Sequence, residues 1–306
     1  MNDVIRTHKL TRSVKGRPII TNVNLTVKKG EIYGLLGSNG AGKTTIMKML
    51  TGIIIPTSGE IMLFGKKLTE ASKDGLKRVG SIIEYPIFFE QLTAMENLLI
   101  HCEYLGYYDR KAITDALDMV SLHGIEHKKV KDFSLGMKQR LGVVRAMITK
   151  PELIVLDEPT NGLDPIGIKD IRELIRMLNN EYGITFILSS HILGEIELVA
   201  DRIGVIQHGM LVNEVSLEDI RKQQSDYIEL VTSDVSRTAY LLEHELRISN
   251  IKIVQDMKIR IYEPDASIGE ISKILVSHHI TIEEIQKHRS TLEDYFYHQI
   301  QGGVQR

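Results

Sequence analysis

Gly37-Ser-Asn-Gly-Ala-Gly-Lys43-Thr44 is the stretch that decides the fold. It matches the phosphate-loop pattern G-x-x-x-x-G-K-[ST] and lies between the apolar run Ile32 to Leu36 and a helical pattern from Thr44 to Leu50. An apolar run of this kind is typical of a buried parallel strand. Strand, glycine-rich loop and helix in this order predict an α/β fold of the P-loop NTPase type.

The same loop predicts how the phosphates of a nucleoside triphosphate are bound. Glycines let successive N–H groups point at phosphate oxygens, and the following helix adds the positive end of its dipole. Lys43 would neutralise the β- and γ-phosphates, and the Thr44 hydroxyl would ligate Mg²⁺. A glycine-rich turn that only needs positive φ angles is the alternative, and the Lys-Thr ending argues against it. The residues expected to bind the nucleotide here are Gly37, Ser38, Asn39, Gly40, Ala41, Gly42, Lys43, Thr44 and Thr45.

Two adjacent acids follow a second apolar run, in Leu153-Ile-Val-Leu-Asp157-Glu158. Because ligands bind at the carboxyl edge of a parallel sheet, both carboxylates are expected beside the phosphate loop. Asp157 would hold Mg²⁺ through water, and Glu158 would polarise the water that attacks the γ-phosphate. The alternative is a surface acid pair that merely ends a strand.

Composition limits the other classes of function. The chain has 306 residues and a net charge of -2, which offers no basic field for holding a nucleic-acid backbone. The single cysteine, Cys102, fits a reducing compartment and has apolar neighbours typical of an inert core thiol. No apolar stretch approaches the roughly 20 residues that span a bilayer, so any channel would belong to another chain.

The remaining patterns predict two domains. A capping box from Thr93 to Glu96 opens a helix, and helical patterns follow at 110–123 and 136–148. Together they predict a helical subdomain at about 88–150, inserted into a nucleotide-binding domain at 1–214.

Residues 215–306 are expected to form a small α+β domain with a ferredoxin-like topology. The expected order is strand, helix, two strands, helix, strand, followed by a final helix. The strands are expected at 227–231, 251–254, 258–262 and 280–282. The helices are expected at 235–245, after a cap formed by Ser267 and Glu270, and after a cap formed by Ser290 and Glu293.

Three further motifs carry a family resemblance. The signature of ATP-binding-cassette (ABC) proteins resembles the stretch Phe133-Ser-Leu-Gly-Met-Lys-Gln-Arg140. Their D-loop resembles Asn161-Gly-Leu-Asp164, and the strand end that carries their switch histidine matches Ser189-Ser-His191. All motifs occur in family order from about Val4 to Glu214. A Ser-x-Gly helix start is common and fits a structural or a functional role equally well by itself, and a lone histidine after a strand is more often structural, but here the motifs occur jointly.

The resemblance implies a site shared between two cassettes that dock head to tail. Ser134 and the N–H of Gly136 would contact the γ-phosphate of ATP bound to the other cassette. His191 would contact the same phosphate, and Asp164 would connect the two sites. Because this chain has one cassette, it is expected to pair with a second copy of itself or with a related chain.

Several positions depart from the family pattern. Leu135 stands where the signature usually has its first glycine, and Met137 stands where it usually has glutamine. Val14 occupies the position of an aromatic residue that stacks on adenine, which predicts weaker discrimination of the base. Glu84 replaces the usual Q-loop glutamine, so we expect it to act as an additional metal-side ligand near Asp157 and Glu158. The alternative for Glu84 is a solvated loop acid.

Glu84, the signature and the tail at 292–296 are similar to those of the bacitracin-resistance and lantibiotic-immunity ATPases. This implies an ATP-hydrolysing subunit of a bacterial exporter, held at the cytoplasmic face of the membrane by a separate integral-membrane permease. The permease would dock on residues 85 to about 108. A non-transport ABC ATPase and a catalytically silent ATP-binding module are the alternatives. Non-transport ABC ATPases usually carry two cassettes in one chain or a long coiled-coil insertion, and this chain has neither. Retention of Lys43, Asp157, Glu158 and His191 argues against a catalytically silent module.

Overall fold

The computed structural model describes residues 3–69, 74–107, 109–223, 227–255, 257–263 and 266–288. The chain forms two compact units, Met1–Leu217 and Glu218–Arg306. Tyr108, the helix expected from Ser290 and the tail at 292–296 lie outside the described residues.

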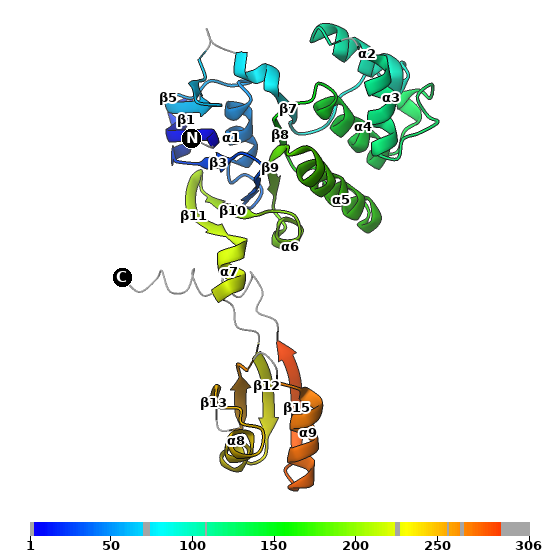
Figure 1. Ribbon diagram of the computed structural model, residues 1–306. Coiled ribbons are helices and arrows are strands. Elements are labelled where there is room, and N and C mark those ends of the chain that lie inside the picture. The colour runs from blue at the N-terminus through cyan, green and yellow to red at the C-terminus, as the bar shows by residue number, and fades with distance from the viewer. Residues whose placement is uncertain are drawn as a thin grey trace. The chain divides into compact units, whose positions relative to one another are not determined.

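A six-stranded sheet forms the centre of the first unit (Figure 1). Its order is β11-β10-β4-β9-β8-β7, and all neighbours are parallel except β10 and β11. Every residue of β8 and β9 is buried, which explains the continuous apolar sequence of β8 and the apolar centre of β9. The strands are β4 (Ile32–Leu36), β7 (Val79–Ile82), β8 (Leu153–Leu156), β9 (Thr185–Ser190), β10 (Arg202–Gln207) and β11 (Met210–Ser216).

A second, antiparallel sheet shares a core with the first. Its order is β2-β1-β5-β6, with β3 also paired to β1. Helix α1 (Lys43–Leu50) contributes Ile46, Met47, Met49 and Leu50 to the apolar core that both sheets line. The phosphate loop is therefore fixed to a buried helix. The strands are β1 (Asp3–Val14), β2 (Arg17–Val23), β3 (Thr26–Lys28), β5 (Ser58–Leu63) and β6 (Lys66–Lys67).

Three helices between β7 and β8 pack against one another, and Figure 1 shows them gathered beside the end of β7. They are α2 (Ala94–Tyr104), α3 (Arg110–Met119) and α4 (Leu135–Met147). The predicted capping box of Thr93 and Glu96 is present at the start of α2. A short 3-10 helix, η1 (Asp74–Arg78), precedes β7, and a second, η2 (Val130–Asp132), lies between α3 and α4.

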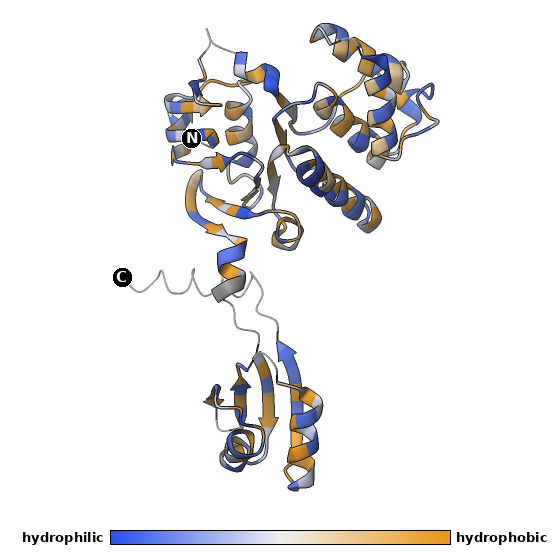
Figure 2. Ribbon diagram, in the orientation of Figure 1, coloured by the Kyte–Doolittle hydropathy of each residue, from blue (hydrophilic) through white to orange (hydrophobic). Residues whose placement is uncertain are grey.

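Helix α5 (Pro165–Tyr182) follows β8, and residues typical of helix termini mark both of its ends. Asp164 caps its N-terminus, Pro165 occupies its first turn, and Gly183 ends it in a left-handed conformation. Its buried residues recur on one side of the helix, and Figure 2 shows apolar residues interspersed with polar ones along it. A short helix, α6 (Leu193–Glu197), follows β9.

The second unit has the element order and sheet order of a ferredoxin-like fold. The sheet order is β13-β14-β12-β15, with antiparallel neighbours throughout. Residues of the strands and of both helices form one apolar core. The elements are β12 (Tyr227–Thr232), α8 (Val235–His244), β13 (Ile251–Gln255), β14 (Lys258–Ile261), α9 (Ile268–Ser277) and β15 (Ile282–His288); α7 (Leu217–Gln223) starts at the boundary between the units.

Three local expectations were wrong. Helix α3 ends at Met119 and not at His123, because the chain turns at Ser121, whose φ of 58° is left-handed. Helix α9 starts after Ser267, but the Ser267 side chain makes no capping hydrogen bond. The last strand runs from Ile282 to His288 because it pairs along the whole of β12.

Candidate functional site

The phosphate loop joins the end of β4 to the start of α1, as its sequence predicts. Gly42 has a φ of 111°, and a Cβ atom there would lie 2.4 Å from Ile20 Cδ1. A Cβ on Gly37 would lie 2.5 Å from the carbonyl oxygen of Ile206. Only glycine fits at these two positions, because β2 and β10 approach the loop so closely.

Lys43 is held inside this loop by oxygen atoms. Its side chain is 5% exposed, and Nζ donates to the carbonyl of Gly37 at 2.7 Å and to that of Ser38 at 3.3 Å. Nζ also lies 3.0 Å from Glu158 Oε1. A buried ammonium group needs oxygen partners of this kind, and these partners hold the Lys43 ammonium at the carboxyl edge of the sheet.

Asp157 lies at the centre of a buried hydrogen-bond network. The residue is 2% exposed, and its carboxylate accepts from Thr44 Oγ1 at 2.7 Å and from Ser189 Oγ at 2.6 Å. Ser189 Oγ in turn accepts from the backbone N–H of Glu158 at 2.8 Å. The network joins the loop, β8 and β9, because the register of the parallel strands brings their carboxyl ends together.

Glu158 connects the lysine to the histidine. Its φ of 47° turns the chain sharply after β8. Its Oε2 lies 2.8 Å from His191 Nδ1, while Oε1 contacts Lys43. Glu158 is 18% exposed and His191 is 37% exposed, so both face an accessible edge. The structure thus brings together Lys43, Thr44, Asp157, Glu158 and His191, which the sequence places in three separate segments.

Ser189 is the member of this network to which sequence reasoning assigned no role. It is 1% exposed and links Asp157 to the Glu158 backbone. The signal that could have found it is a hydroxyl residue at the end of an otherwise apolar buried strand, next to the predicted site.

Glu84 does not join the acids as expected. Its carboxylate lies 2.5 Å from Lys48 Nζ, on the last turn of α1, and its side chain is 59% exposed. Among the residues that the structure describes, no group of three or more His, Cys, Asp or Glu side chains is arranged to hold a metal ion. The expectation that Glu84, Asp157 and Glu158 share one cation is therefore not met in this arrangement, because Lys48 attracts the Glu84 carboxylate.

The other predicted residues lie on separate elements. Val14 is 41% exposed and pairs with Arg17 at the tip of the β1–β2 hairpin, whose Ile20 abuts the phosphate loop. Ser134 caps α4 by accepting from the N–H of Met137. Gly136 is in the first turn of α4, and Asp164 caps α5 through the N–H of Gly167.

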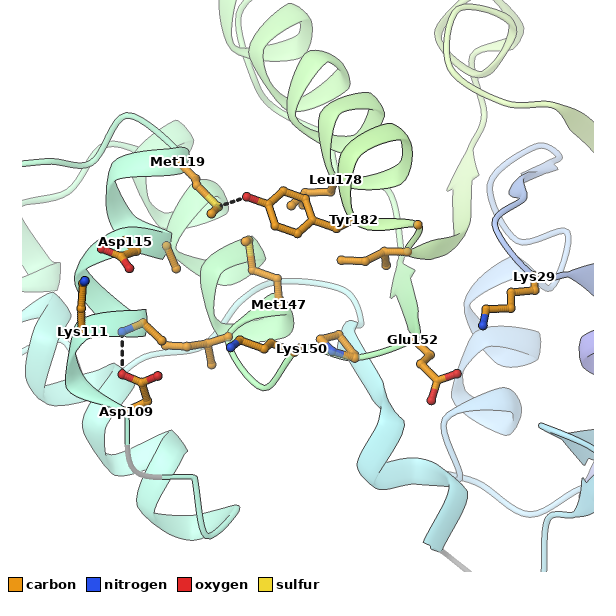
Figure 3. Close-up of a pocket in the computed structure, with 16 residues that line it drawn as sticks. Lys29, Asp109, Lys111, Asp115, Met119, Met147, Lys150, Glu152, Leu178 and Tyr182 are labelled. Carbon is orange, nitrogen blue, oxygen red and sulfur yellow. Dashed lines mark hydrogen bonds between the residues drawn. The ribbon is translucent and has the colours of Figure 1, made fainter.

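A cavity of about 580 Å³ lies at the opposite edge of the sheet. Pro151 and Glu152, just before β8, and Ile184, just before β9, help to line it. Figure 3 shows Met119 of α3 and Tyr182 of α5 directed toward each other, and the Tyr182 hydroxyl lies 3.9 Å from Met119 Sδ. This cavity is distinct from the predicted nucleotide site, which is at the carboxyl edge.

Comparison with known proteins identifies the family. The sequence model for the ABC transporter family matches residues 20–161. An uncharacterized ABC transporter ATP-binding protein of Bacillus subtilis, YcbN, is 55% identical over 302 residues, which cover 99% of this chain and 98% of that protein.

The chain belongs to the ATP-binding proteins of ABC transporters.

Named members of the ABC family are also similar over long stretches. The bacitracin transport ATP-binding protein BcrA of Bacillus licheniformis is 44% identical and covers 99% of each chain. The lantibiotic transport ATP-binding protein SrtF of Streptococcus pyogenes is 46% identical over 211 residues, covering 69% of this chain and 90% of SrtF. These matches confirm the resemblance on which the predicted function rests.

A solved ABC cassette supports the fold and the activity. The dimeric post-hydrolysis structure of MJ0796 with ADP and Pi is 26% identical, with a TM-score of 0.63, and covers 70% of this chain and 98% of MJ0796. The chain is thus an ABC ATPase with the predicted α/β fold. Among the described residues, no helix is both long enough and apolar enough to cross a bilayer.

Proposed function

We propose that this ABC ATPase works as a head-to-tail dimer and drives the export of bacitracin- or lantibiotic-type peptides through a separate membrane permease. The observation that carries the catalytic part is the convergence of Lys43, Asp157, Glu158 and His191 on the phosphate loop. These side chains supply a cation for phosphate, a carboxylate for metal and a base with its own hydrogen-bond partner.

Each side chain has a distinct task in hydrolysis. Lys43 binds the phosphate oxygens, which would replace Glu158 as its anionic partner. Glu158 then accepts a hydrogen bond from the attacking water and orients it toward the γ-phosphate. His191, 2.8 Å from Glu158, holds that carboxylate in position and contacts the γ-phosphate.

The residues beside the phosphate loop also fit Mg²⁺. Thr44 and Asp157 place a hydroxyl and a carboxylate 2.7 Å apart, and hard oxygen donors are the ligands that Mg²⁺ prefers. In P-loop enzymes the ion is held by few protein ligands together with phosphates and waters, so this pair is sufficient. When bound, the ion neutralises charge on the transferred phosphoryl group.

Assembly of two copies would complete the site. Ser134 and the N–H of Gly136 lie at the N-terminus of α4, where a helix favours anions, and they would contact the γ-phosphate on the second copy. Asp164 would connect the two sites from the loop before α5. The family signature and the dimeric MJ0796 relative support this arrangement.

The permease would dock on an exposed apolar groove of the helical subdomain. The groove has a volume of about 300 Å³ and includes Ile87, Phe88, Phe89, Ile100 and Tyr104. Ile87 is 81% exposed and Tyr104 is 89% exposed, which is unusual for large apolar side chains that stay in water. Docking there would hold the ATPase at the cytoplasmic face of the membrane.

Co-purification with the permease tests the groove. Ile87→Asp and Tyr104→Asp should lose the permease while the isolated subunit keeps its ATPase activity. Tyr182→Asp is the matched control, because Tyr182 is 54% exposed but lies at the end of α5. Retention of the permease by both groove variants contradicts this surface.

Peptide resistance tests the cargo. The chain and its permease, expressed together in a sensitive bacterial host, should raise the inhibitory concentration of bacitracin or of a lantibiotic. Glu158→Gln should abolish the increase without changing the level of either protein. An active ATPase that raises resistance to neither peptide would show that the proposed cargo is wrong.

A further inference from the structure

The signature and the D-loop of the same chain interlock through a leucine that departs from the family pattern. Leu135 is the first residue of α4 and is 43% exposed. A Cβ atom on Gly162 would lie 2.9 Å from Leu135 Cδ2, so the Leu135 side chain rests directly on the D-loop backbone. Gly162 also has a φ of 77°, which favours glycine.

A second leucine makes the reciprocal contact. Leu163 of the D-loop packs toward Gly136 of α4, where a Cβ would lie 3.7 Å from Leu163 Cδ2. Leu163 also packs toward Gly167 of α5, where a Cβ would lie 3.4 Å from Leu163 Cβ. Leu135 of the signature thus packs on Gly162 of the D-loop, and Leu163 of the D-loop packs on Gly136 of the signature. We call this pair of contacts the leucine-glycine lock.

An ion pair strengthens the connection beyond the lock. Arg140 on α4 pairs with Asp170 on α5, about one turn further along each helix. The first turns of α4 and α5 are thus joined by apolar packing at one end and by opposite charges next to it. Closely packed contacts of this kind leave no room for one helix start to move without the other.

The lock also lies close to Glu158 along the chain. The N–H of Asn161 donates to the carbonyl of Glu158 at 3.1 Å, and the N–H of Leu163 donates to the carbonyl of Thr160 at 3.1 Å. Two consecutive tight turns therefore separate Glu158 from Leu163. The backbone between Glu158 and Leu163 has little conformational freedom, because a backbone hydrogen bond closes each turn.

We infer that the leucine-glycine lock couples the signature of each copy to Glu158 of the same chain, and that Leu135 is a positioning residue for hydrolysis. The inference rests on the proposed function, in which the signature contacts ATP of the second copy. Binding of that γ-phosphate at Ser134 would then set the position of Glu158 at the chain's own ATP. The two sites of the dimer would communicate through each chain.

Kinetics of Leu135 variants test the coupling. Leu135→Ala removes the contact with Gly162, while Leu135→Met keeps an apolar side chain of similar volume. We expect Leu135→Ala to lower kcat on the order of tenfold and to reduce the Hill coefficient for ATP toward 1. Binding of a fluorescent ATP analogue to the isolated monomer should stay unchanged, and Leu135→Met should restore most of kcat.

Two controls separate coupling from stability. Leu198→Ala removes a leucine that is 51% exposed and lies at the end of α6, so it should leave kcat unchanged. Leu163→Ala should resemble Leu135→Ala, and the double variant should be no worse than the more affected single variant. Strict additivity of the two effects would show that the leucines do not act as one unit.

The outcomes also distinguish this inference from the proposed function. Wild-type kcat and cooperativity in Leu135→Ala, with a cooperative wild-type enzyme, would overturn the lock alone. A wild-type protein without ATP turnover, either alone or with its permease, would overturn the proposed function and with it the inference.

Discussion

Replacing Ser189 by alanine should damage both stability and catalysis, although this residue contacts no substrate in the proposed function. The Ser189 hydroxyl donates to Asp157 Oδ1 at 2.6 Å and accepts from the Glu158 N–H at 2.8 Å. The residue is 1% exposed, so water does not readily replace the lost hydroxyl. Ser189→Ala leaves a carboxylate without one donor and a backbone N–H without its acceptor.

The expected magnitude follows from these two contacts. A hydrogen bond to a charged group contributes about 1.5–3 kcal/mol, and an unsatisfied buried N–H costs about 1–3 kcal/mol. We therefore expect the free energy of unfolding to fall by about 2.5–6 kcal/mol. The kcat for ATP should fall as well, because Asp157 and the Glu158 backbone lose a common anchor.

Ser190→Ala is the matched control for this experiment. Ser190 is also buried, but its hydroxyl accepts from the N–H of Ile192 at 3.0 Å within a local turn, and its contacts with the Ile192 carbonyl and the Glu195 carboxylate are long, at 3.4 Å each. Its loss should lower the free energy of unfolding by about 0.5–1.5 kcal/mol. Urea unfolding gives both values, and a steady-state phosphate-release assay gives kcat. Equal destabilisation by the two substitutions, with kcat unchanged in Ser189→Ala, would refute the reasoning.

Four further predictions concern the site and its surroundings. Glu158→Gln should lower kcat by about 10²–10⁴-fold while ATP binding persists, as measured by phosphate release and by fluorescent-nucleotide titration. Val14→Tyr should strengthen ATP binding by about 0.5–1.5 kcal/mol through stacking on the base, and calorimetry showing equal or weaker affinity would contradict it. Because Lys48 holds the Glu84 carboxylate, Glu84→Gln should leave the Mg²⁺ dependence of ATPase activity unchanged, whereas Lys48→Met should release that carboxylate and lower the Mg²⁺ concentration for half-maximal activity; a Lys48→Met curve that superimposes on the wild-type curve would contradict this. Burial and the nearby Arg145 guanidinium lower the pKa of His101 in the folded protein. The unfolded chain therefore protonates His101 more readily, and the free energy of unfolding should fall as the pH drops below about 6.5. The urea midpoints at pH 7.5 and pH 5.5 should differ less in His101→Gln than in the wild-type protein.

Local sequence patterns predicted most of the fold because the relevant interactions are local. The capping box at Thr93 satisfies N–H groups within one turn of its own helix, and the apolar residues of β8 record burial on both faces. The ferredoxin-like order of the second unit followed from alternating short patterns in the same way. The end of helix α3 was one of the exceptions, because the apolar pattern continues past the left-handed turn at Ser121 that ends it.

The family motifs also predicted which residues converge, since the carboxyl ends of neighbouring parallel strands must meet at one edge. Lys43, Asp157 and His191 come from segments more than thirty residues apart in the sequence, yet strand register brings them together. Their pairing was not predictable in the same detail. Glu84 was expected among the acids, but its partner is Lys48, a choice that depends on where the turn after β7 lies against α1.

The sequence by itself determined that this chain is an ABC ATPase, because phosphate chemistry demands particular residue types at fixed spacing in the loop, the acid pair and the signature. Only the tertiary structure decided how those motifs are connected. It identified Ser189 as the link between Asp157 and Glu158, assigned Glu84 to Lys48, and laid Leu135 on Gly162. Each of these contacts joins segments distant in sequence, and such contacts depend on packing distances that no local pattern encodes.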